Sequence, residues 1–71
     1  MIDQDSLIRY MKNARDALTE AYLDASYLQY NARESADRQM FMEIHNQLRA
    51  MRDDVSTMLK YSEEITSAHI R

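Results

Sequence analysis

Side chains that could support chemistry are present in this chain, but they do not have the spacing that such chemistry needs. Metal sites in helical bundles use a glutamate followed three residues later by a histidine, so that both point inward from one helix face. The third residue after Glu43 is an asparagine, and the third residue after Glu63 is a threonine. His45 and His69 lie far apart, and neither has a second ligand at a chelating position. We therefore predict no metal site and no bound cofactor.

Nucleophilic and phosphate chemistry also lack their usual residues. A catalytic serine or cysteine needs an activating base beside it, but the chain has no cysteine, and its serines fall within predicted helices or at a helix cap. Loops that hold phosphate groups need glycine, which is absent. The pairs Asp53–Asp54 and Glu63–Glu64 are sequence neighbours that diverge by about 100° around a helix, so each pair is a solvated surface feature. We predict that the protein is not an enzyme.

The composition predicts a helical chain. None of the 71 residues is glycine or proline, the two residues that most often end helices and shape the turns between strands. A chain this short buries only about 60% of the surface that its unfolded form exposes. Because the absence of cysteine also excludes disulfides, we expect a second subunit or a permanent partner to supply part of the stability.

Two apolar series predict the helices, each with the alternating spacing of coiled-coil a and d positions. The first series is Leu7, Met11, Ala14, Leu18, Ala21, Ala25, Leu28 and Ala32. The second is Phe41, Ile44, Leu48, Met51, Val55 and Met58, followed by Ser62, Ile65 and His69. Continuing the first series past residue 32 would place mostly polar residues in it, so the two series do not share one straight helix. The first is rich in alanine and the second in larger side chains, which predicts that they pack on each other.

We predict an all-α fold, an antiparallel two-helix hairpin of the coiled-coil type, as a single domain over residues 1–71. The first helix is expected over about 3–31, the turn over about 32–36 and the second helix over about 37–69. Asp3 can cap the first helix, and Asn31 tolerates the left-handed conformation that ends many helices. Ser35 or Asp37 can cap the second helix. The alternative is one continuous helix that dimerises along its length.

Several large apolar residues fall outside the two series and need a partner of their own. Six of them flank the series and predict a wider apolar face, which suits a helix packed between two neighbours. They are Ile8, Tyr10, Tyr22, Met40, Leu59 and Tyr61. Two interpretations are open: a homodimer of hairpins that forms a four-helix bundle, or a groove filled by a helix of another protein.

Leu23, Tyr27 and Tyr30 form a separate stripe, spaced four and then three residues apart, on the side of the first helix that faces away from the predicted seam. Tyrosine is enriched in interfaces because its ring buries area while its hydroxyl stays hydrated. We predict that this stripe binds a partner protein. Scattered surface aromatics, which are normal on any protein, are the alternative interpretation.

The charge pattern argues against nucleic acid and membrane partners. The net charge is −3, from 9 basic and 12 acidic residues, and the largest basic cluster is Arg49 with Arg52. A nucleic-acid binder needs a positive face, and no apolar run approaches the length of a membrane span. We predict a cytoplasmic protein that binds neither nucleic acid nor membrane.

These observations predict a small protein-binding module that acts through helix contacts, as an adaptor, a chaperone-like subunit or an inhibitor of a partner protein. Small helical chains without catalytic residues are typical of bacterial and phage accessory proteins. Two other functions stay open. One is a dimeric RNA-binding regulator, which would need Arg9, Lys12 and Arg15, or Arg49 and Arg52, to cluster. The other is a purely structural coiled-coil oligomer.

Overall fold

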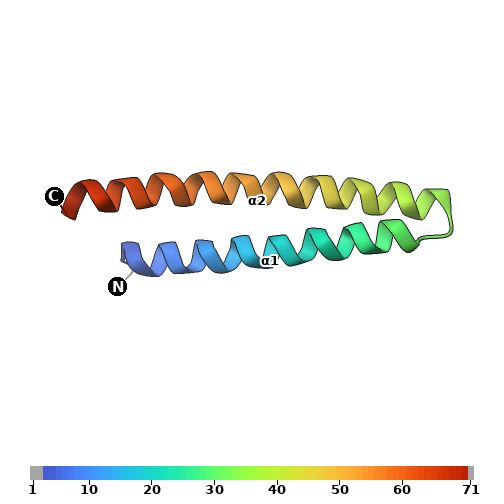
Figure 1. Ribbon diagram of the computed structural model, residues 1–71, viewed down its shortest axis with the longest axis horizontal. Helices are drawn as coiled ribbons and strands as arrows, with labels where there is room; N and C mark the ends of the chain where they lie inside the picture. Colours follow the sequence, from blue (N-terminus) through green and yellow to red (C-terminus); the bar gives the residue numbers. More distant parts are fainter. Residues whose placement is uncertain (1–2, 71) are drawn as a thin grey trace.

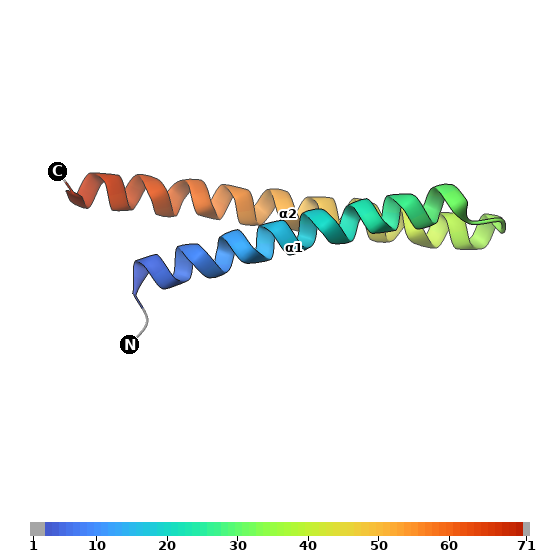
Figure 2. The same ribbon diagram turned by 60° about the horizontal axis from the view of Figure 1, so that its bottom comes forward.

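The chain forms two long antiparallel helices joined by a short turn (Figure 1). In this computed structural model, α1 covers Gln4–Asn31 and α2 covers Ser35–Ile70. The structure describes residues 3–70, and the side chains of residues 3–64. The molecule is a rod of 56 × 19 × 15 Å, and α1 lies beside α2 at an inclined angle (Figure 2). The prediction of an all-α hairpin is confirmed, and the turn is shorter than expected, at residues 32–34.

Asp3 caps the first helix, as the sequence predicted. Its side chain accepts a hydrogen bond from the backbone N–H of Ser6 at 2.7 Å, and its backbone is extended, with φ −117° and ψ 171°. The bond satisfies one of the free N–H groups at the helix start. Because it also stabilises the charged carboxylate, it lowers the pKa of Asp3 below the ordinary 3.8. The Asp3 side chain therefore caps the N-terminus of α1.

The turn is held by a residue that the sequence did not single out. The Arg38 guanidinium Nη1 donates to the backbone carbonyl oxygens of Ala32 and Arg33, both at 3.2 Å. The expected left-handed residue is not there, because no described residue has a positive φ. Instead, the Asn31 side chain donates to the carbonyl oxygen of Tyr27 at 2.8 Å within the last turn of α1. Ser35 is the first residue of α2 and not its cap.

The core between the helices is thin. Among the described side chains, only Ala25 and Leu59 are buried hydrophobics, with exposed fractions of 5% and 3%. The other inward-facing positions are half-buried and recur with alternating spacings of three and four residues. On α1 they include Ile8, Met11, Arg15, Leu18, Tyr22 and Gln29, followed by Ala32 just after the helix, and on α2 they include Phe41, His45, Leu48, Arg52, Val55 and Ser62. Several of these are polar, so the hairpin alone buries little apolar surface.

Part of each predicted apolar series faces the partner helix, and part does not. Met11, Leu18 and their heptad equivalents lie in the interface as expected. Six members are exposed instead: Leu7, Ala14 and Leu28 on α1, and Ile44, Met51 and Met58 on α2. In their place each helix turns inward a neighbouring row, which contains Tyr22 on α1 and Arg52 on α2. The expectation that the two complete series pack on each other is therefore wrong for these six members.

Removal of the Asp3 cap should destabilise the hairpin in a pH-dependent way. A carboxyl group whose pKa is lowered by folding contributes stability above its unfolded pKa and loses it as the pH falls through the folded value. We expect Asp3→Ala to lower the thermal midpoint at pH 7, and the difference from the wild type to vanish near pH 2. Circular dichroism melts across this range measure it. Asp5→Ala is the control for loss of one acid in the same helix turn, and an equal effect would contradict the cap.

Leu59 should contribute more to stability than any exposed leucine. Truncation of a buried leucine costs about 2–5 kcal/mol, whereas changes at exposed positions usually stay within about 0.5 kcal/mol. We expect Leu59→Ala to unfold much of the population, and Leu23→Ala, the same change on the outer side of α1, to have little effect. Urea titrations followed by circular dichroism compare the two. Equal losses would show that α2 is rotated differently from the description above.

Candidate functional site: two unlike sides of the hairpin

The contacts of Tyr22 define one side of the hairpin. Its ring meets the His45 ring edge-on, with centroids 5.4 Å apart and an interplanar angle of 72°. The Arg52 guanidinium lies 4.9 Å from the centre of the same ring, and its Nη1 donates to the Tyr22 hydroxyl at 2.9 Å. The Tyr22 row of α1 and the His45–Arg52 row of α2 therefore meet on one side of the interface, which we call the polar side.

The polar side is built from charged groups that pair with one another. Arg52 also donates to the Asp53 carboxylate, with Nη2 to Oδ1 at 2.8 Å, and this bond raises the pKa of Arg52 above its ordinary value. Lys12 of α1 pairs with Glu63 of α2 at 3.7 Å across the hairpin. These groups are partly exposed, so each ion pair contributes little free energy to the fold. The Lys12–Glu63 pair joins the two helices, whereas the Arg52–Asp53 pair lies within α2.

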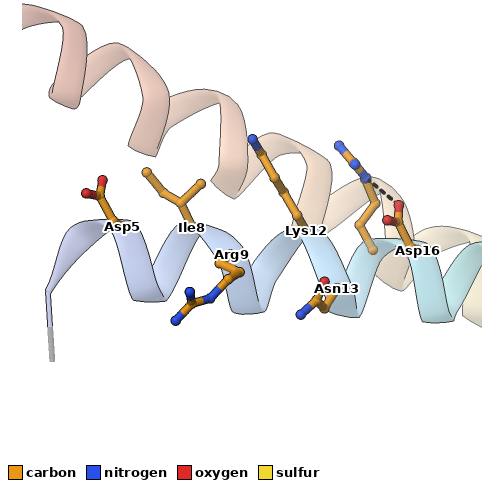
Figure 3. Close-up of a pocket in the computed structure, with 7 residues that line it drawn as sticks. Asp5, Ile8, Arg9, Lys12, Asn13 and Asp16 are labelled. Carbon is orange, nitrogen blue, oxygen red and sulfur yellow. Dashed lines mark hydrogen bonds and ion pairs between the residues drawn. The ribbon is translucent and has the colours of Figure 1, made fainter.

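A shallow hollow opens on α1 near its start. It is lined by Asp5, Ile8, Arg9, Lys12, Asn13, Arg15 and Asp16. Asp5, Ile8 and Lys12 point toward α2, whereas Arg9 and Asn13 point away from it (Figure 3). Arg15 donates to the Asp16 carboxylate at 3.3 Å. The hollow mixes both charges, and two of its cations, Lys12 and Arg15, already have acidic partners, so it does not form a concentrated anion or cation site.

The opposite side of the interface is apolar. Each helix has a second row that flanks its inward residues, and these two rows must meet on the side away from Tyr22. We call this surface the apolar side and define it by Leu7, Ala14, Ala21 and Leu28 of α1 and Ile44, Met51 and Met58 of α2. Its five large side chains are 41–49% exposed. Both helices thus contribute an aligned apolar row whose large side chains the hairpin covers only in part.

The outer margin of the apolar side carries more apolar groups and mostly acidic charges. Tyr10, Met40 and Tyr61 stand one residue outside the rows and are exposed. Helical periodicity places Asp3 and Asp24 of α1 and Asp54 of α2 on this margin and Asp37 in line with Ile44, whereas Glu20, Glu43 and Glu64 lie further round, on the outer face of each helix. The Arg9 guanidinium, which lies 5.8 Å from the centre of the Tyr10 ring, brings a basic group to one end of the margin. The other basic residues of the described helices lie on the polar side or the back, where acidic residues also occur, so it is the positive charge that is segregated.

The predicted tyrosine stripe lies on the outer surface of α1. Leu23, Tyr27 and Tyr30 are all exposed, and Tyr30 is the most exposed of them at 89%. Their exposure fits the sequence-based placement away from α2. Whether this stripe binds a partner stays a prediction, since exposed tyrosines by themselves are ordinary.

The six residues predicted to flank the seams do not form one surface. Tyr10, Met40 and Tyr61 lie along the margin of the apolar side. Ile8 and Tyr22 belong to the polar-side row and are half-buried, and Leu59 is enclosed between the helices. The sequence-based prediction missed the distribution of charge because it placed only the apolar residues on the helix faces. Placing the acidic and basic residues relative to the apolar row of each helix would have shown it.

Other kinds of site and the comparisons add nothing to this picture. Within the described residues, no three histidine, cysteine, aspartate or glutamate side chains gather where a metal ion could bind, and His69 lies outside the described side chains. No described helix has a stretch that is both long and apolar enough to cross a membrane. Comparisons with protein-family models, curated proteins and solved structures gave no match.

Charging the apolar side should leave the hairpin intact. Met51 and Met58 are half-exposed, so glutamate at these positions keeps its charge in water. We expect Met51→Glu/Met58→Glu to retain the helical spectrum and to bind less of an apolar fluorescent dye than the wild type does. The matched change inside the interface, Leu48→Glu/Leu59→Glu, should abolish the fold because it buries charge. A collapsed Met51→Glu/Met58→Glu variant would show that these methionines belong to the core of the single hairpin.

Proposed function

We propose that this protein is a non-catalytic binding module, and that another polypeptide binds to the apolar side of its hairpin. The observation that carries the proposal is the aligned, exposed row of Leu7, Leu28, Ile44, Met51 and Met58. Contiguous apolar surface with a polar margin marks contact sites on small soluble proteins. The thin core supports the same conclusion, because a chain whose described part buries only two hydrophobic residues would gain stability from a partner that covers more of its apolar surface.

The partner's covering helices would complete a bundle. Two helices with wide apolar faces are half of a four-helix bundle, so either a second hairpin or a helical segment of another protein fits this surface. In such a role the protein acts as an adaptor, a chaperone-like subunit or an inhibitor that occludes a partner's helix. We place it in the cytoplasm, because a chain without cysteine suits a reducing compartment.

RNA binding is the second candidate, and one observation favours it. Arg15, Arg49 and Arg52 fall on the polar side, which gathers cations that the sequence left dispersed. Against it, Arg15 and Arg52 pair with adjacent aspartates, and Lys12 pairs with Glu63. Phosphates would have to displace these carboxylates, so the apolar side is the stronger basis for a function.

Site-directed photocrosslinking in cells of the source organism tests the proposal. A photoreactive amino acid replaces Met51 on the apolar side, Tyr27 on the tyrosine stripe or Arg49 on the polar side, one at a time. We expect position 51 to give a discrete protein adduct that Ile44→Glu abolishes. Adducts to nucleic acid at position 49 would favour the RNA-binding candidate. An adduct at position 27 that Tyr30→Ser abolishes would assign the contact to the tyrosine stripe instead.

A further inference from the structure

We infer that the apolar side binds an amphipathic helix of another protein whose apolar stripe is bordered by lysine and arginine. The inference rests on the proposed function and adds the chemistry of the partner. It is carried by the charge of the margin: Asp24 and Asp54 border the apolar side on the two helices, and the basic group that reaches this margin, Arg9, lies against Tyr10 near one end of it. An apolar stripe flanked by basic residues is the complementary surface.

A second copy of the same hairpin fits this surface less well. A two-fold symmetric contact brings the same patch of both subunits together. It would therefore set the acidic margin, including Asp24 and Asp54, against the acidic margin of the other copy, and Arg9 reaches this margin only at its Tyr10 end. Like charges brought together in a contact oppose binding. A basic helix instead gains attraction along both edges of the same apolar row.

The shape and composition of the surface suit a helix. From Leu7 to Leu28 the apolar side runs for roughly 32 Å along α1, at about 1.5 Å per residue, which matches a helix of about 20 residues. Two of its exposed large side chains, Met51 and Met58, are methionines, and a third methionine, Met40, lies on its margin. Their unbranched, flexible chains adjust to the side chains of an incoming helix.

Two synthetic peptides of about 20 residues test the inference on the full chain. Both carry the same leucine stripe, and one has lysine at every flanking position where the other has glutamate. Fluorescence anisotropy measures the affinity of each labelled peptide at low and at moderate salt. We expect the lysine peptide to bind, with an affinity that falls as salt rises, and the glutamate peptide not to bind.

Two double charge reversals locate the contact. Asp24→Lys/Asp54→Lys reverses charge on the margin of the apolar side, and Asp16→Lys/Asp53→Lys makes the same change in net charge on positions outside it. All four residues are exposed, and circular dichroism confirms that both variants stay folded. We expect the first variant to lose roughly tenfold in affinity for the lysine peptide and the second to lose much less.

The outcomes separate a failure of the inference from a failure of the proposed function. Equal or tighter binding of the glutamate peptide, or equal losses in the two variants, overturns the preference for a basic helix while leaving the apolar contact standing. A stable dimer in sedimentation that Met51→Glu dissociates overturns it in favour of a second copy. Failure of both peptides, together with the absence of an adduct at position 51 in cells, overturns both.

Discussion

A hairpin of two helices has one interface, and each helix can turn only one stripe into it. In this protein the stripes that turn inward contain Tyr22, Arg52 and Leu59, so the neighbouring rows with Ile44 and Met51 stay outside. The rest of the structure follows from this choice. It leaves two buried hydrophobic residues in the described part of the chain, an apolar surface along one side and paired charges along the other.

The side chains that meet in the interface explain why these stripes face inward. Tyr22 and Arg52 are amphipathic, so the ring and the methylene chain pack in the interface while the hydroxyl and the guanidinium bond to each other at its edge. Arg52 also bonds to Asp53 of its own helix, and the ion pair of Lys12 on α1 with Glu63 on α2 ties the two helices on the polar side. The methionine and leucine rows have no such directional bonds, and they remain available for a partner that excludes water from them.

Sequence features predicted the parts of the fold that depend on single residues or on the composition of the whole chain. The hairpin followed from the absence of glycine and proline and from the shift between the two heptad series. The start of the first helix followed from the capping chemistry of Asp3. The series could not predict which half of each apolar face turns inward, because the rows on both sides of Leu18 and Leu48 contain apolar residues. That choice depends on contacts between residues 30 apart in sequence, such as Arg52 with Tyr22. The role of Arg38 in the turn was missed for the same reason, because its guanidinium bonds to the carbonyl oxygens of Ala32 and Arg33, which are available only once the turn has formed.

Methionine oxidation of the pure protein tests the orientation of the helices most directly. Methionine reacts with peroxide according to its exposure, and the chain has methionines at both exposed and half-buried positions. Met40, Met51 and Met58 are exposed, whereas Met11 and Met42 are half-buried. Peptide mass spectrometry during a peroxide time course should show the first three oxidising together and ahead of the other two. Protection of Met51 and Met58 relative to Met11, in protein that sediments as a single chain, would contradict an uncovered apolar side.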